Sequence, residues 1–238
     1  MPSKLSTKLF SRNFVKVFFL SLLILALLLF FQEIYHIKNI QIEADQNQNV
    51  LGWKKYKNQI SLFLNSNQIT KELEEKNPGL KIKQVKIALP NTLVINVIQN
   101  KGAADIKASR GLLTIDKNAK IIKKSENNES NLPVITYYQK FDYLTSEVGS
   151  KLDFNDLIFT LQILDAIENF GYQINSIDIQ GPTMIVLNLS NQKKIVVSSQ
   201  DSVSDLQNKL NVILKQLRIR GTDFSQLDLR FNKPVVIF

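Results

Sequence analysis

The side chains that could perform catalysis or bind a metal are few in this chain. His36 is the only histidine, and nothing near it in the sequence supplies a nucleophile or an orienting partner. Cysteine is absent, which excludes thiolate metal sites, thiol redox chemistry and disulfides. Asp153 and Asp156 are close enough for acid–base work, but they stand at a predicted helix start, where capping explains them.

Loop motifs that bind ions or nucleotides are also missing. The stretch Asp116-Lys117-Asn118-Ala119 resembles a calcium loop only slightly, because the twelve-residue ligand spacing and the terminal glutamate are lacking, so we expect a turn. The glycines are isolated, and neither G-x-G-x-x-G nor a P-loop occurs. The sequence therefore predicts no catalytic residue, no cofactor, no metal and no small-molecule substrate. It predicts a non-enzymatic protein that works through its surface.

One segment near the amino terminus indicates that the protein is held in a membrane. An apolar run from Val17 to Phe31 follows four basic residues, with no acidic residue before Glu33. The run alone is short for a hydrocarbon core of about 30 Å, but Ile34 and Tyr35 extend it at one end. Phe14 and Val15 extend it at the other, with Lys16 snorkelling toward the headgroups. We expect a membrane anchor over residues 14–35, and the residues that define it are Lys16, Val17, Phe31 and Tyr35.

The basic flank also predicts orientation. An excess of lysine and arginine before the span places residues 1–13 in the cytoplasm and the rest outside it. The competing interpretation is a cleaved signal peptide, but the residues after Ala26 are large and give no small-residue cleavage site. Which membrane is spanned stays open.

The charge outside the anchor is moderate. The formal net charge is +9, of which four basic residues precede the span, and 26 basic residues stand against 21 acidic ones after it. The outer lysines are scattered without an aromatic platform or a known motif, which disfavours nucleic-acid binding. They solubilise the surface and favour, weakly, an anionic wall polymer or headgroup.

The residues after the anchor predict a first α+β domain. Residues 36–43 alternate as a strand with Ile40 and Ile42 on one face. An amphipathic helix is indicated by the three- and four-residue spacing of Trp53, Tyr56, Ile60 and Phe63. A shorter helix follows, capped by Ser66 or Asn67 and ended by the Asn77-Pro78-Gly79 stretch. Alternation over residues 85–89 and 93–97 predicts a hairpin, so both helices can cover one face of a three-stranded sheet.

A second domain is predicted beyond it. Short strands are expected at residues 104–108, 112–115 and 120–123. A helix over residues 153–170, capped by Asp153 and stopped by Gly171, precedes an antiparallel meander over 174–179, 184–189 and 194–198. The stripe in the last helix, over residues 202–220, favours packing onto the sheet, although a short coiled-coil seam is the alternative.

The ordered set of motifs resembles the FtsQ/DivIB family of bacterial cell-division proteins. The residues that carry the resemblance are Asn77-Pro78-Gly79-Leu80, Val85-Lys86-Ile87, Leu89-Pro90-Asn91-Thr92-Leu93-Val94-Ile95-Asn96-Val97, Ala103-Ala104, Leu132-Pro133-Val134-Ile135 and Leu227-Asp228-Leu229-Arg230-Phe231. Gly102 stands where the family has proline before the alanine. Ala119 replaces the glycine of an Ile-Asp-x-x-Gly hairpin, so we expect a different turn geometry there.

The resemblance implies an α+β organisation in four parts. These are a cytoplasmic tail at 1–13, a transmembrane helix at 14–35, a β-α-α-β-β POTRA domain at 36–102 and an antiparallel-sheet-plus-helices β domain at 103–238. It also implies a single-pass divisome scaffold of the cytoplasmic membrane, located at the septum, that helps to regulate septal peptidoglycan synthesis. The implied partners are FtsB-like and FtsL-like membrane proteins and other divisome components.

A terminal strand with a free edge suits β-augmentation, the mode by which the resemblance implies an FtsB-like partner binds. On that basis we expect the contact along Leu229, Arg230, Phe231, Asn232, Val235 and Val236. Core packing is the alternative for Phe231, since alternation places it on the same face as Leu227 and Leu229. The rival hypothesis for the whole protein is a membrane-tethered envelope enzyme or wall-polymer binder unrelated to division.

Overall fold

The computed structural model describes residues 12–44, 48–128 and 130–238. They form two compact units: the first comprises the chain up to Glu74 together with 82–98, and the second comprises 75–81 and 99–238. The expected tail at 1–13, with Lys4 and Lys8, lies almost entirely outside the described residues. The domain boundaries expected at 35/36 and 102/103 stay predictions.

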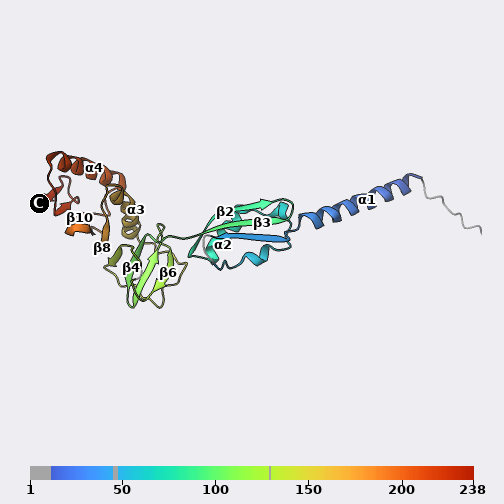
Figure 1. Ribbon diagram of the computed structural model, residues 1–238, viewed down its shortest axis with the longest axis horizontal. Helices are drawn as coiled ribbons and strands as arrows, with labels where there is room; N and C mark the ends of the chain where they lie inside the picture. Colours follow the sequence, from blue (N-terminus) through green and yellow to red (C-terminus); the bar gives the residue numbers. More distant parts are fainter. Residues whose placement is uncertain (1–11, 45–47, 129) are drawn as a thin grey trace, which may run out of the picture. The chain divides into compact units, whose positions relative to one another are not determined.

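The first element is a long apolar helix, α1 (Arg12–Tyr35; Figure 1). Its segment Lys16–Tyr35 has a mean hydropathy of 2.5 and is unburied, and it is the one described helix long and apolar enough to cross a membrane. At about 1.5 Å per residue, its 20 residues extend about 30 Å, which matches a hydrocarbon core. Near its end the ring of Phe31 stacks on that of Tyr35, with centroids 5.8 Å apart. The helix therefore fits a single-pass membrane protein.

A three-stranded sheet forms the body of the first unit. Strands β1 (Asn39–Ala44), β2 (Leu80–Ala88) and β3 (Thr92–Gln99) lie in the order β1-β3-β2, and β1 runs parallel to β3. The predicted alternation holds in β3, where Leu93, Ile95 and Val97 are buried. In β2 the alternation predicted over residues 85–89 is wrong at its last residue, because Leu89 lies in the turn after the strand and is exposed.

The predicted pair of helices is corrected to one α-helix. Trp53, Tyr56, Ile60 and Phe63 do not form an amphipathic helix; two short 3-10 helices, η1 (Trp53–Tyr56) and η2 (Ser61–Phe63), occupy this stretch. Backbone with positive φ at Gly52 and Asn58 bounds η1 and prevents a continuous helix. Helix α2 (Ser66–Lys76) buries Ile69 and Leu73. Its cap is Asn65, whose Oδ1 accepts the N–H of Asn67 at 2.9 Å, rather than Ser66 or Asn67.

The second unit contains one nine-stranded sheet in the order β12-β11-β10-β9-β8-β7-β4-β5-β6. Its strands are β4 (Ala104–Ala108), β5 (Gly111–Ile115), β6 (Ile121–Ser125), β7 (Val134–Tyr137), β8 (Ile174–Gly181), β9 (Met184–Leu189), β10 (Lys194–Val197), β11 (Gln226–Asp228) and β12 (Val235–Ile237), and a short 3-10 helix, η3 (Ser190–Gln192), joins β9 to β10. The expected meander of β8, β9 and β10 is antiparallel.

The expectation of an antiparallel sheet throughout this unit is wrong. The pairs β4·β7, β7·β8 and β10·β11 are parallel. Two of these pairs follow from the helices: α3 (Asn155–Asn169) connects β7 to β8, and α4 (Val203–Arg220) connects β10 to β11. A crossover helix returns the chain in the same direction, so the strands on either side of it run parallel.

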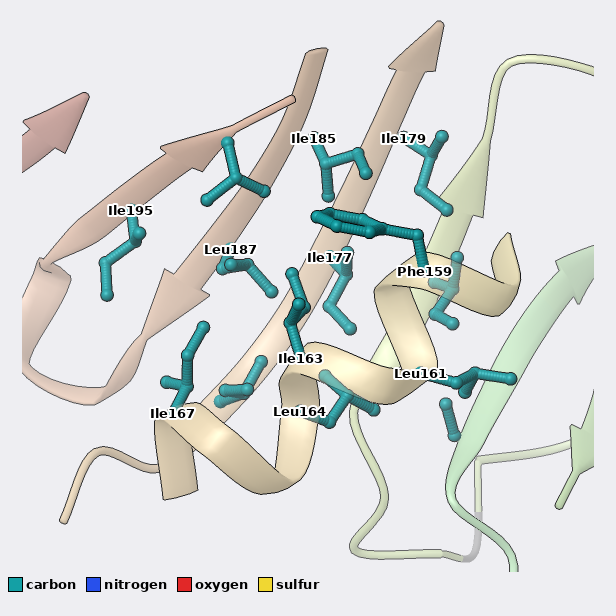
Figure 2. Close-up of a cluster of buried hydrophobic side chains, with 14 of the residues drawn as sticks. Phe159, Leu161, Ile163, Leu164, Ile167, Ile177, Ile179, Ile185, Leu187 and Ile195 are labelled. Atoms are coloured by element: carbon teal, nitrogen blue, oxygen red, sulfur yellow. The ribbon is translucent and has the colours of Figure 1, made fainter. Parts of the chain in front are cut away.

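The core of the second unit lies between these helices and the sheet. Helix α3 directs Leu161, Leu164 and Ile167 into it, and Figure 2 shows the helix lying over the isoleucines and leucines of β8, β9 and β10. Helix α4 adds Leu206, Leu210, Leu214 and Leu217 to the same cluster. The sheet-packing interpretation of the last helix is thus confirmed over the coiled-coil alternative.

The ends of the two helices test the predicted caps. Gly221 has positive φ directly after α4, and Gly171 has positive φ one residue beyond Phe170, the C-cap of α3, as their stop signals predict. Ser202 caps α4 by accepting the N–H of Asp205 at 3.1 Å. The cap predicted for Asp153 is wrong: α3 begins one residue later, after Phe154, and Asp153 instead forms an exposed ion pair with Lys151.

The hairpin turn between β5 and β6 corrects another expectation. Ala119 has φ +59°, in the left-handed region that glycine prefers, so the turn keeps a glycine-like conformation without the glycine. The Oδ1 of Asp116 accepts the N–H groups of Asn118 and Lys120 at 2.9 and 3.0 Å, which explains the aspartate at the first turn position.

Candidate functional site

The candidate site is the end of the nine-stranded sheet formed by β11 and β12. Strand β11 pairs in parallel with β10, and β12 pairs with β11 in antiparallel register, with Val236 opposite Leu227. Ser225 N–H donates to the carbonyl of Ile237 at 2.8 Å, which extends the pairing by one residue. Since β12 is the last strand in the sheet order, its outer side is an edge among the described residues. Such an edge is a template for a further strand.

The two faces of β12 differ in environment. Val236 packs on the hydrophobic core together with Leu227, which is fully buried. Val235 and Ile237 point to the opposite face and are about half exposed, at 47% and 48%. The strand therefore has an inner face that anchors it and an outer face whose apolar side chains are available to a partner.

A charged pair fixes the turn that leads into this strand. The Arg230 guanidinium donates to both carboxylate oxygens of Asp228, with its closest approach 2.6 Å from Nη2 to Oδ2. The Asp228 side chain is 10% exposed and that of Arg230 is 30% exposed. Hydrogen bonding to Arg230 holds the pKa of Asp228 below its usual range and raises the pKa of the guanidinium. The guanidinium also lies 5.5 Å from the ring centre of Phe231.

The structure separates the predicted contact residues into two groups. Leu229 is fully buried and its N–H donates to Val196 at 2.8 Å, so its side chain belongs to the core and cannot contact a partner. Phe231 is 53% exposed, which removes the alternative that it packs beneath α4. Phe231, Asn232 and Val235 are the exposed members of the predicted set that flank or belong to the edge, and Arg230 beside them is half-buried.

Two exposed apolar residues were missed by the sequence interpretation. Ile237 is half exposed beside Val235, and Phe238 follows it at 74% exposure. The period-two spacing of 235 and 237 was the available signal, because successive side chains of a strand alternate between faces. The predicted contact at Val236 falls on the inner face instead.

Helix α4 supports the site from the core side. The Lys209 ammonium pairs with Asp201 at 3.2 Å and lies 3.4 Å from the carbonyl oxygen of Leu229. Because Leu229 immediately precedes Arg230, this contact links the helix to the turn before β12.

Two buried aspartates elsewhere in the second unit accept hydrogen bonds from side chains of the fold itself. The buried Asp105 accepts hydrogen bonds from Thr114 at 2.6 Å and from Ser130. The buried Asp156 accepts from the Tyr137 hydroxyl at 2.8 Å, and burial together with hydrogen bonds to Tyr138 and Asp156 raises the pKa of Tyr137. Within residues 12–44, 48–128 and 130–238, no group of three or more histidine, aspartate or glutamate side chains is placed to hold a metal ion.

His36 lies where α1 joins the rest of the first unit, one residue after the helix, and its ring contacts the carbonyl of Gln32.

An apolar helix followed by two α+β units fits a single-pass membrane protein, and the free strand edge on the second unit is a surface suited to binding.

Comparison with known proteins gives the particular relationship. No family model matches the chain. The chain is 22% identical over 223 residues to the cell division protein DivIB of Clostridium tetani (strain Massachusetts / E88), a match that covers 90% of this chain and 83% of the relative. This homology confirms the resemblance seen in the sequence and supports a DivIB/FtsQ-type assignment. It indicates a role in cell division.

Proposed function

We propose that the protein is a non-enzymatic divisome scaffold that recruits and links division proteins at the septum and so helps to regulate septal peptidoglycan synthesis. In this proposal α1 anchors it in the cytoplasmic membrane, with the amino terminus inside and both α+β units outside. The observation that carries the proposal is the exposed edge of β12, together with the DivIB relationship.

The binding step follows from the geometry of that edge. A partner strand placed beside β12 would gain main-chain hydrogen bonds, and its alternate side chains would cover Val235 and Ile237. Phe231 and the Arg230 guanidinium border the edge and would add an aromatic surface and a cation. We assign this edge to an FtsB-like partner, and the first unit to FtsL-like or other anchor-level partners.

The location of the protein in the cell tests the division role. A fluorescent fusion to the full chain should form a band at midcell, and depletion should give filaments or chained cells. A dispersed signal with altered wall composition would instead support a membrane-tethered envelope enzyme or wall-polymer binder.

The strand edge is tested separately by charge substitution. The double variant V235K/I237K places two lysines on the outer face of β12, and we expect it to abolish pull-down of the FtsB-like partner. The matched control is Val212→Lys, which makes the same change at an exposed valine on α4. Thermal unfolding should be unchanged in both variants, because these side chains are already about half exposed. Retained binding by V235K/I237K would refute the assignment of the edge.

A further inference from the structure

The chain emerges from α1 at a defined end of the first unit. His36, the residue after the helix, forms a β-bridge with Ile60. The N–H of Ile37 donates to the carbonyl of Gln59 at 2.8 Å, and the N–H of Lys38 donates to the carbonyl of Asn91 at 2.9 Å. Two turns, at residues 58–63 and 89–91, therefore lie beside the point where the unit meets the anchor helix.

These turns carry large apolar side chains that the unit does not bury. Phe63 is 83% exposed, and Leu62 and Leu89 are each 61% exposed. The two turns are joined, since the buried Ser61 donates its hydroxyl to the carbonyl of Pro90 at 2.8 Å. We call Leu62, Phe63 and Leu89 the membrane-proximal patch. Their exposure in the folded unit needs an explanation outside its core.

The two stretches of chain that carry this patch hold charges of one sign, and the nearby Glu33, at the end of α1, is paired with Lys38 at 3.5 Å. Residues 46–71 and 76–104 contain no aspartate or glutamate, although both stretches contain several lysines. Lys57 and Lys86 flank the turns and are exposed. Headgroup regions with anionic lipids attract lysines and disfavour carboxylates, so this distribution suits a lipid surface.

The distance to the bilayer is short. When the 20-residue segment of α1 fills the hydrocarbon core, His36 lies at the level of the headgroups. Ile60 is one β-bridge, about 5 Å, from His36. The N–H of Phe63 donates to the carbonyl of Ile60 at 3.1 Å in a 3-10 turn, so the two residues are about 6 Å apart. The headgroup layer is about 5–8 Å thick on each side of the core, so the separation of the patch from His36 is of the same order as the thickness of that layer.

We propose that Leu62, Phe63 and Leu89 insert into the interfacial layer of the bilayer and hold the first unit on the membrane surface, with Lys57 and Lys86 against anionic headgroups. The bilayer is the occupant that the position favours, because the patch continues from the end of the anchor helix. This inference depends on α1 spanning the membrane and not on the role in cell division.

Depth measurements on the full chain test the proposal. The protein contains no cysteine, so Phe63→Cys, Leu62→Cys and Lys83→Cys each give a single site for a nitroxide label. Lys83 is the matched control, because it is exposed on β2 six residues before Leu89, about 20 Å away along the strand. Leu22→Cys, within α1, reports whether the anchor is in lipid. Each variant is placed at one copy per nanodisc of phosphatidylcholine and phosphatidylglycerol.

The measured quantity is the ratio of label collisions with oxygen to those with a water-soluble nickel complex. We expect this ratio at positions 62 and 63 to exceed that at position 83 by roughly threefold or more, because oxygen concentrates in lipid and the nickel complex is excluded from it. Equal ratios at 62, 63 and 83, with a lipid-like ratio at 22, would overturn the proposal while leaving the anchor intact. Protection that appears only when discs hold two copies would assign the patch to a second copy and also overturn it.

Discussion

The ion pair between Asp228 and Arg230 determines how firmly the turn before β12 is held, and Arg230→Ala tests it. Removing one partner of a fully buried pair costs about 3–5 kcal/mol, whereas exposed pairs contribute about 0–1 kcal/mol. Here the side chains are 10% and 30% exposed, and the hydrogen bond from the Arg230 backbone N–H to Asp228, at 3.1 Å, survives the substitution. We therefore expect a loss of about 2 kcal/mol in the free energy of unfolding of the second unit at pH 7.

The effect should depend on pH in a defined direction. Since Arg230 holds the pKa of Asp228 below its usual 3.8, the pair stabilises the fold above about pH 4, and its contribution is lost as the pH falls through the lowered pKa. The difference between wild type and Arg230→Ala should thus be largest at neutral pH and shrink at acidic pH, where Asp228 is protonated.

Far-UV circular dichroism of the full chain in mild detergent can follow this transition. A loss of about 2 kcal/mol corresponds to roughly 4–8 °C in the midpoint for a unit of this size. Trp53 is the only tryptophan and lies in the first unit, so its fluorescence reports that unit separately and should not change. Lys233→Ala, at an exposed cation in the same turn, is the control, with an expected change within about 0.5 kcal/mol.

A double-mutant cycle decides whether the pair is the cause. In a background that carries Asp228→Asn, the Arg230→Ala substitution should cost clearly less than in the wild type. An equal cost in both backgrounds, or a cost that does not shrink at acidic pH, would refute the reasoning.

Three further predictions concern other contacts. Hydrogen bonds, of which that from Lys55 has the largest effect, lower the pKa of Glu72 from 4.5 to about 2. The first unit, followed by Trp53 fluorescence, should therefore lose stability as the pH falls from about 5 toward 2, and Glu72→Gln should flatten this pH dependence. Tyr137→Phe removes a hydrogen bond to the buried Asp156 and should cost about 1.5–3 kcal/mol in denaturant unfolding; no change would contradict that role. Ala119→Val, at φ +59°, should destabilise the second unit by about 2 kcal/mol or more, whereas Ala119→Gly should be close to neutral.

Sequence patterns among neighbouring residues correctly predicted helices and strands that are specified by such patterns. The alternation of Leu93, Ile95 and Val97 identified β3, and the serine and glycine at either end of α4 identified its bounds to within one residue. The first predicted helix failed because apolar residues three or four apart also suit two 3-10 turns, and the positive φ at Asn58 that separates those turns has no clear signal in one sequence.

The pairing of strands that are distant in the sequence could not be predicted from local sequence patterns. That β7 lies between β4 and β8, and that β11 joins β10 in parallel, depends on how the crossover helices pack. At the candidate site the sequence indicated the segment that forms the sheet edge, but it placed Leu229 on the surface and left Phe231 undecided. The backbone bends after Asp228, so the period of two does not continue from Leu227 to Phe231.

The route by which β11 reaches the sheet has a consequence for when the edge exists. Strand β12 pairs only with β11, and β11 can pair with β10 only after α4 has crossed over the core. A nascent or proteolytically nicked chain in which α4 is undocked therefore presents no such strand. A protein that recognised β12 would therefore bind molecules in which α4 is docked and not those in which it is undocked.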